Sequence, residues 1–189
     1  MHTIVERKKV DRKLASTVRA TLIDANAAIL AANNLFKSID LPADAKISLY
    51  LPIGSEIETA PLFEGLKARN ITTLLPVVEG KDRPLIFKEW AVGHPLDNGH
   101  FNVPVPIENA KNMAPTILLV PLLAFDANGY RLGYGGGFYD RTLEALRANS
   151  GCMAVGYAYA GQEVAQVTID KFDQPLDWLV TEKEARKRL

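Results

Sequence analysis

Residues 123–147, LAFDANGYRLGYGGGFYDRTLEALR, most strongly constrain the fold of this 189-residue chain. Ahead of them, residues 116–121 (TILLVP) form a short apolar run, which predicts a strand buried on both faces. Behind the glycines, Phe138, Leu143 and Leu146 recur at helical spacing. The glycines therefore lie on a strand-to-helix connection, which is typical of α/β folds.

The composition of this connection predicts a phosphate-binding loop. A helix N-terminus presents unpaired N–H groups and partial positive charge, and glycine lets a phosphate approach the backbone closely. Arg131 precedes the glycines and Arg141 follows them, and guanidinium groups bind phosphate oxygens in pairs. The loop contains Gly133, Gly135, Gly136 and Gly137.

The same residues leave a tight turn without a ligand open as an alternative. The loop matches neither GxxxxGK[ST] nor GxGxxG, because Phe138 stands where a third glycine would be required. Asp140 falls in the first helical turn, where a carboxylate suits Mg²⁺ beside a nucleotide. The alternative is that Asp140 only favours the helix N-terminus electrostatically.

Alternating strand and helix patterns predict a mainly parallel sheet. We expect strands at residues 47–51, 72–78, 116–121, 153–158 and 178–180, an edge strand at 85–90, and a helix at 57–68. The prolines at 95, 104, 106 and 115 indicate a long irregular connection. Open sheets of this kind bind ligands beyond the carboxyl ends of their strands, where the loops after Leu51 and Pro121 would lie.

An apolar stripe predicts one long amphipathic helix over residues 4–33. On the opposite side, Lys8, Arg12 and Arg19 cluster within about 40° of one another, given a rotation of about 100° per residue. This basic cluster is a candidate arm for nucleotide phosphates, and a solvated basic face is the alternative. The stripe consists of Val10, Leu14, Val18, Leu22, Ala25 and Ile29.

The string AFDANGYRLGYGGGFYDR strongly resembles the signature of the 5-formyltetrahydrofolate cyclo-ligase family, which reads close to GxAFDxxGxRLGxGxGYYDR. Phe138 replaces the first tyrosine of that signature, and Leu122 and Leu123 depart from the usual residues before Ala124. Three further segments resemble the family in the same order: Lys8 with Arg12, residues 47–59, and residues 173–182. The resemblance implies a Rossmann-like three-layer α/β fold with a long N-terminal helix.

The resemblance implies a specific reaction, the ATP-dependent cyclisation of 5-formyltetrahydrofolate to 5,10-methenyltetrahydrofolate. ATP would phosphorylate the formyl oxygen, N10 would attack the activated carbon, and ADP and phosphate would be released. Such a route needs positioning and charge stabilisation but no nucleophilic side chain. We take Arg131 and Tyr139 as candidate catalytic residues. The candidate ATP-binding residues are Lys8, Arg12, Arg131, Leu132, Gly133, Tyr134, Gly135, Gly136, Gly137, Phe138 and Tyr139.

The resemblance also implies a folate site and a magnesium site. Glu56 is expected to accept hydrogen bonds from the amino-pyrimidine edge of the pterin, although it could instead only cap a helix starting at Ile57. Asp140 and Asp177 are the candidate Mg²⁺ ligands, with Asp173 as the alternative to Asp177. Where the family usually carries an acidic residue before Pro106, this chain has Val105, which leaves the contacts of that loop open. The candidate folate-binding residues are Leu51, Glu56, Tyr134, Gly135, Gly136, Gly137 and Phe138.

Composition predicts one domain over residues 1–189, because 48% hydrophobic residues suffice for one core. Twenty-two basic and 22 acidic residues argue against a nucleic-acid ligand. The absence of an apolar run long enough to span a bilayer argues against a membrane, and one cysteine, Cys152, fits the reducing cytoplasm. No protein partner is implied. Two other functions stay open: a non-catalytic nucleotide-binding regulator, and an ATP-using enzyme with another small-molecule substrate.

Overall fold

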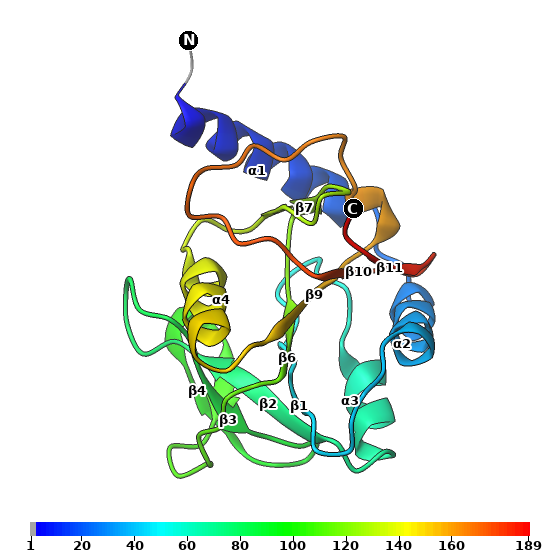
Figure 1. Ribbon diagram of the computed structural model, residues 1–189, viewed down its shortest axis with the longest axis vertical. Helices are drawn as coiled ribbons and strands as arrows, with labels where there is room; N and C mark the ends of the chain where they lie inside the picture. The colour runs from blue at the N-terminus through cyan, green and yellow to red at the C-terminus, as the bar shows by residue number, and fades with distance from the viewer. Residues whose placement is uncertain (1–2) are drawn as a thin grey trace.

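A seven-stranded sheet forms the centre of the structure, a computed structural model that describes residues 3–189 (Figure 1). The strand order is β11-β10-β9-β6-β1-β2-β3, and the five inner strands run parallel. Only the edge strands β11 and β3 pair antiparallel, which confirms a mainly parallel sheet with an edge strand near residues 85–90. The strands are β1 (Lys46–Ser48), β2 (Thr72–Val77), β3 (Ile86–Glu89), β6 (Ile117–Val120), β9 (Met153–Tyr157), β10 (Trp178–Val180) and β11 (Ala185–Lys187).

Strand β6 lies in the middle of the sheet, and all four of its residues are buried. This confirms the prediction from its continuous apolar sequence, since a strand covered on both faces has no side that favours polar residues. Its neighbour β1 is in register with it through Ile47 opposite Ile117.

Helices cover both faces of the sheet, which gives the predicted three layers (Figure 1). Helices α2 (Ala27–Ser38) and α3 (Ala60–Lys67) pack on one face through a core that includes Leu35, Leu62 and Leu66. Helix α4 (Phe138–Asn149) packs on the other face, where Leu143 lies in a second core. Burial of the apolar sides of these helices against the sheet stabilises the fold.

The N-terminal helix α1 (Ile4–Ala20) is shorter than predicted. It begins with a capping box between Thr3 and Glu6 and ends where residues 21–26 turn before α2. In that turn the Asp24 carboxylate accepts a hydrogen bond from the backbone N–H of Asn26. The prediction of one continuous helix over residues 4–33 is therefore wrong. The physical reason is that a short polar side chain that bonds to the nearby backbone competes with helix formation.

Helix α1 lies across the carboxyl ends of the parallel strands, at the top of Figure 1. Its orientation is the reverse of the one predicted from its apolar stripe. Val10 and Leu14 are 67% and 65% exposed, whereas Lys8 and Arg19 are 8% and 3% exposed. The basic face is therefore turned inward, which excludes the solvated basic face considered above for these two residues.

The order of the inner strands creates a crevice beneath α1. The chain leaves β1 towards β2 on one side and leaves β6 towards β9 on the other, so β1 and β6 form a topological switch point. Ligands of such sheets bind at the carboxyl ends of the strands at this point. Short elements surround it: β4 (Leu96–Asn98), β5 (Pro104–Pro106), β7 (Ala124–Phe125), β8 (Arg131–Leu132), and the 3-10 helices η1 (His100–Asn102) and η2 (Ala160–Gln162).

Candidate active site

The hairpin β7–β8 holds the start of the glycine loop in place. Asp126 lies at its turn, where one carboxylate oxygen accepts backbone hydrogen bonds from Asn128 and Tyr130 and the other accepts one from Val167. Asp-Ala-Asn-Gly, residues 126–129, is a sequence suited to such a tight turn. Helix α4 begins at Phe138, directly after the loop, so the predicted strand–glycine loop–helix arrangement is present.

The glycine loop adopts backbone conformations that favour glycine. Gly135 and Gly137 have φ angles of +100° and +66°, in the left-handed region. Gly137 is also the N-cap of α4 and has no side chain with which to cap the helix. The N-terminus of α4 thus opens towards the space above the loop.

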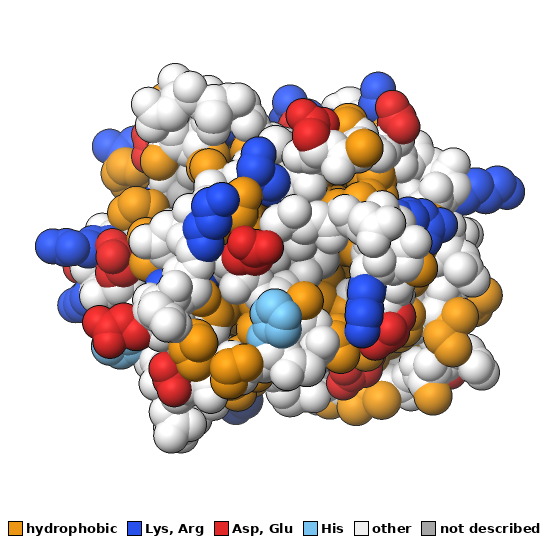
Figure 2. Space-filling view, turned by 90° about the horizontal axis from the view of Figure 1, so that it is seen from below, with side chains coloured by type: hydrophobic (Ala, Val, Ile, Leu, Met, Phe, Trp, Pro, Cys, Tyr) orange, Lys and Arg blue, Asp and Glu red, His pale blue; other side chains and the backbone are white. Residues whose placement is uncertain are grey.

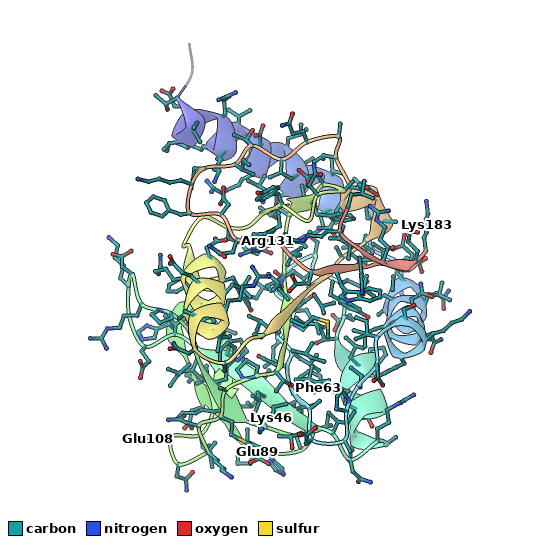
Figure 3. The ribbon with its side chains drawn as sticks, viewed as in Figure 1. Lys46, Phe63, Glu89, Glu108, Arg131 and Lys183 are labelled. Carbon is teal, nitrogen blue, oxygen red and sulfur yellow. The ribbon has the colours of Figure 1, made fainter. Side chains whose placement is uncertain are left out.

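A polar pocket of about 680 Å³ lies over the loop and beneath α1. It brings together every residue that was predicted to bind ATP, together with Arg141 and three aspartates. Figure 3 shows Arg131, one of the candidate ATP-binding residues, between α1 and the sheet. Lys46, Glu89 and Glu108 lie at the opposite end of the molecule. The polar pocket is lined by Val5, Lys8, Arg12, Pro121, residues 131–141, Glu144, Asp170, Phe172 and Asp173.

Each basic side chain of the polar pocket has a protein partner. Lys8 Nζ lies 2.7 Å from Asp170 Oδ2 and 2.5 Å from Asp173 Oδ2. Burial alone would lower the pKa of Lys8, but the two carboxylates raise it above its ordinary value. Arg12 Nε donates to the carbonyl of Gly133 at 2.9 Å and so braces the loop.

Arg131 is the most buried cation in the wall of the polar pocket. Its Nη2 donates to Asp140 Oδ1 at 2.8 Å, and its Nη1 donates to the carbonyl of Gln174. Burial lowers the pKa of Arg131 while Asp140 acts in the opposite direction, and an arginine remains charged at neutral pH. A fixed guanidinium beside a helix N-terminus is well suited to bind a polyanion.

Four carboxylates line the polar pocket, those of Asp140, Glu144, Asp170 and Asp173, and Asp177 is not among them. The Asp177 carboxylate instead accepts hydrogen bonds from Arg147 and from the backbone N–H of Ala154. The structure therefore brings Asp173, the alternative, into the same pocket as Asp140 and does not bring Asp177 there. Asp177 was a candidate because of the family resemblance, which does not show where its side chain lies in the fold.

A second pocket, of about 420 Å³, adjoins the first and is mostly apolar. The two pockets share Pro121, Tyr134, Gly136, Phe138 and Tyr139 as a common wall. Leu51 and Glu56, two of the candidate folate-binding residues, line this apolar pocket, whereas Gly135 and Gly137 line only the polar one. Its other lining residues are Tyr50, Ile53, Leu75, Pro76, Val78, Leu85, His100, Val103, Pro104 and Val105.

Glu56 is the only carboxylate among the residues lining the apolar pocket, and it is 6% exposed. Its Oε1 accepts a hydrogen bond from the Tyr134 hydroxyl at 2.6 Å, and its Oε2 accepts one from the backbone N–H of Ile53 at 2.8 Å. Burial raises the pKa of Glu56, partly offset by these hydrogen bonds and by Arg19. Helix α3 begins four residues later, at Ala60, so capping of a helix at Ile57 does not explain this carboxylate.

Tyr139 lies between the two pockets and is half-buried. Burial, and then the charge of Glu56, raise the pKa of its phenol well above the ordinary value. The hydroxyl therefore stays protonated at neutral pH and can act as a hydrogen-bond donor.

Arg19 does not join Lys8 and Arg12 in the polar pocket. Its Nε donates to Ser55 Oγ at 3.0 Å, its Nη1 donates to the carbonyl of Leu122 at 3.2 Å, and Nη1 lies 3.7 Å from Glu56 Oε1. The prediction that Arg19 reaches nucleotide phosphates is therefore wrong. The helical pitch predicts that the three cations lie on one face of the helix. It does not predict how deeply each side chain enters the crevice.

The hairpin β4–β5 forms a wall of the apolar pocket that the sequence did not reveal. The two strands pair antiparallel, and Val103, Pro104 and Val105 line the pocket together with His100. Val105, whose contacts were left open, therefore supplies an apolar surface. The prolines of this segment were interpreted as an irregular connection, because proline is ordinarily confined to edge strands.

The match to known proteins is extensive: a model of the 5-formyltetrahydrofolate cyclo-ligase family matches residues 5–182. The chain belongs to this family. The 5-formyltetrahydrofolate cyclo-ligases of Haemophilus influenzae and Escherichia coli are 37% and 32% identical to it over 135 and 140 residues. The alignments cover 69% and 71% of this chain, and 72% and 76% of the respective relatives.

Solved structures of cyclo-ligase relatives share the fold. The Aquifex aeolicus 5,10-methenyltetrahydrofolate synthetase superposes with a TM-score of 0.80 at 31% identity and covers 95% of this chain and 92% of its own. A Mycoplasma pneumoniae 5,10-methenyltetrahydrofolate synthetase, at 24% identity, agrees in fold with a TM-score of 0.72 over 93% of this chain and 98% of its own. The chain is therefore a member of an enzyme family.

Side chains of different types are mixed on the surface of the molecule. On the face shown in Figure 2, basic and acidic side chains are interspersed, with hydrophobic side chains between them. Within residues 3–189, no helix combines the length and the apolar character needed to cross a bilayer.

Proposed function

We propose that this chain catalyses the ATP-dependent cyclisation of 5-formyltetrahydrofolate to 5,10-methenyltetrahydrofolate. The observation that carries the proposal is the pair of adjoining pockets that share the glycine loop as their wall. One pocket is lined by cations and a helix N-terminus, and the other is apolar with a single buried glutamate. A reaction that transfers phosphate onto a folate requires two such pockets side by side.

The polar pocket is the proposed ATP site. The backbone of Gly133–Gly137 and the N-terminus of α4 would bind the triphosphate, with Lys8, Arg12 and Arg131 as its cationic partners. Leu132, Tyr134, Phe138 and Tyr139 would complete the walls around the nucleotide. Lys8 and Arg131 would exchange their carboxylate partners for phosphate oxygens when ATP binds.

The carboxylates released by this exchange suit Mg²⁺. Asp140 and Asp173 line the polar pocket, and Mg²⁺ takes one or two carboxylates together with water and nucleotide phosphates. Asp140 and Asp173 would hold the ion, which would supply positive charge to offset the charge that develops on the transferred group. No group of three or more His, Cys, Asp and Glu side chains within the described residues forms a site complete in itself. This suits an ion that binds together with a nucleotide.

The apolar pocket is the proposed folate site. The amino-pyrimidine ring of the reduced pterin is planar, so apolar side chains can pack on its faces, and its edge offers the N–H donors that a carboxylate accepts. Glu56 would bind that edge, while Leu51 and Phe138 would contact the ring. The Tyr134 hydroxyl donates a hydrogen bond to Glu56 Oε1 in the free protein, and this bond would break when the substrate donates to the same oxygen.

The proposed reaction has two steps, each balanced within the bound ligands. The γ-phosphoryl group of ATP passes to the formyl oxygen, and ADP leaves. N10 then attacks the formyl carbon and loses its proton, and phosphate departs with the electrons of the carbon–oxygen bond. Arg131 would stabilise charge on the transferred group, and the Tyr139 hydroxyl would donate towards oxygen at the boundary of the pockets.

The direct test is to mix the protein with ATP, Mg²⁺ and 5-formyltetrahydrofolate and to follow the near-UV absorbance of the methenyl product. We expect absorbance to rise only when all three are present and one ADP to form for each product molecule. A parallel reaction with a non-hydrolysable ATP analogue is the control. Product formation without ADP, or no product under any condition, would refute the proposal.

A further inference from the structure

The guanidinium of Arg19 joins the two loops of the switch point. Ser55 and Glu56 follow β1, whereas Leu122 follows β6, and Arg19 contacts all three. The side chain comes from a third element, α1, and is 3% exposed. A charge this deeply buried is costly unless its hydrogen bonds and its counter-charge are both supplied.

Glu56 depends on this arrangement for its charge balance. Four charged or titratable side chains face it: Arg19 from α1, Tyr134 from the glycine loop, Tyr50 after β1, and Tyr139 from α4. Arg19 is the only cation of the four. The Tyr134 ring also lies 5.4 Å from the Arg19 guanidinium, so the arginine borders the tyrosine that competes for Glu56.

We propose that Arg19 is a positioning residue for the folate side of the reaction: it orients the carboxylate of Glu56 and keeps it charged for the pterin edge. Arg19 touches neither pocket as a lining residue and so acts through Glu56. The proposal rests on the proposed function. It also divides α1 into two parts, with Lys8 and Arg12 serving the nucleotide and Arg19 serving the folate.

The test is a comparison of Michaelis constants for the two substrates in Arg19→Gln. Loss of the cation should raise KM for 5-formyltetrahydrofolate about tenfold, equivalent to ~1.4 kcal/mol, and leave KM for ATP within about twofold. The matched control is Arg147→Gln, because Arg147 pairs with an aspartate at 2.9 Å outside both pockets. Arg147→Gln should leave both constants unchanged.

The pH profile gives a readout that a merely structural role would not move. Arg19 lowers the pKa of Glu56, so Arg19→Gln should shift the acid limb of kcat/KM for the folate to higher pH. Arg147→Gln should not shift it. Arg19→Lys retains the positive charge but not the planar guanidinium. It should restore the acid limb of kcat/KM to its wild-type pH and reverse only part of the increase in KM for the folate.

Two further outcomes keep the proposal falsifiable. If Arg19→Gln does not fold, Ser55→Ala removes the acceptor of Arg19 Nε and should raise the folate KM alone, by a smaller factor. Equal changes in both Michaelis constants, or an unchanged folate KM in these variants, would overturn the role of Arg19 while the wild-type protein remained active. An inactive wild-type protein would instead refute the proposed function.

Discussion

The hydroxyl of Tyr134 donates a 2.6 Å hydrogen bond to Oε1 of Glu56, from the glycine loop to the apolar pocket. The ring of Tyr134 is half exposed and lines both pockets, so one side chain links the two proposed ligand sites. A substrate that donates to Oε1 of Glu56 would compete with this hydroxyl for the same oxygen. The free protein therefore holds the carboxylate that we propose for folate binding in a partly occupied state.

Replacement of Tyr134 by phenylalanine tests this competition. Tyr134→Phe removes the competing donor and keeps the ring, and we expect Kd for 5-formyltetrahydrofolate to fall about threefold, a fraction of the strength of a hydrogen bond to a charged group. Isothermal titration in the presence of a non-hydrolysable ATP analogue measures it. Weaker binding would show that the hydroxyl assists the substrate instead of competing with it.

The pH dependence of kcat/KM for the folate should reflect the burial of Glu56. Burial raises the pKa of this carboxyl above that of an exposed glutamate, about 4.3, and only the ionised form offers both oxygens to two donors without a proton on one of them. We therefore expect kcat/KM for the folate to decline as pH falls through a value above the ordinary range. In Glu56→Gln the limb should vanish and kcat/KM should be low at every pH. A limb at the position of an exposed glutamate would contradict this prediction.

Two glycines of the loop provide a matched pair of alanine variants. A Cβ on Gly135, at φ +100°, would lie 3.1 Å from the guanidinium carbon of Arg12. Gly135→Ala thus combines backbone strain of about 1–3 kcal/mol with displacement of Arg12, and KM for ATP should rise about tenfold. Gly133→Ala has no neighbouring heavy atom within 4 Å, other than its chain neighbours, and should change this constant much less. Initial-rate kinetics at saturating folate compare the two variants, and equal effects would refute the argument.

Asparagine variants of two aspartates distinguish the proposed metal ligand from its alternative. Asp173 lines the polar pocket, whereas Asp177 is bonded to Arg147 outside it. Asp173→Asn should raise the Mg²⁺ concentration needed for half-maximal activity about tenfold, because Mg²⁺ prefers charged oxygen ligands. Asp177→Asn should leave this concentration unchanged and affect thermal stability alone. Titration of activity with Mg²⁺ decides between them, and the reverse pattern would return Asp177 to the site.

Two variants of Arg131 distinguish the effect of its positive charge from the effect of its planar guanidinium geometry. Arg131→Lys keeps a cation beside Asp140 but loses the planar fork, so kcat should fall at least about tenfold. Thermal unfolding should change little compared with Arg131→Ala, which would leave Asp140 without its partner. Arg147→Lys is the control for a conservative change at a partly buried ion pair. Near-normal kcat in Arg131→Lys would remove Arg131 from the proposed mechanism.

Local sequence determined several of the secondary-structure elements and turns of this protein. The apolar run that became β6, the turn at Asp126 and the glycines before α4 each follow from preferences that act within a few residues. Their order along the chain predicted a mainly parallel sheet with ligands at its carboxyl edge. The residues expected around ATP lie in one pocket because most of them belong to a single loop and its flanks.

Only the tertiary structure decided which faces and which distant segments meet. The apolar stripe of α1 pointed to a buried face, yet the helix turns that stripe outward, because Lys8 and Arg19 find buried partners in residues 170–173 and 55–56. The same long-range folding brought Asp173 rather than Asp177 to Asp140 and placed Arg19 beside Glu56. Such pairings depend on packing between segments far apart in the chain, which periodicity and local propensity do not encode.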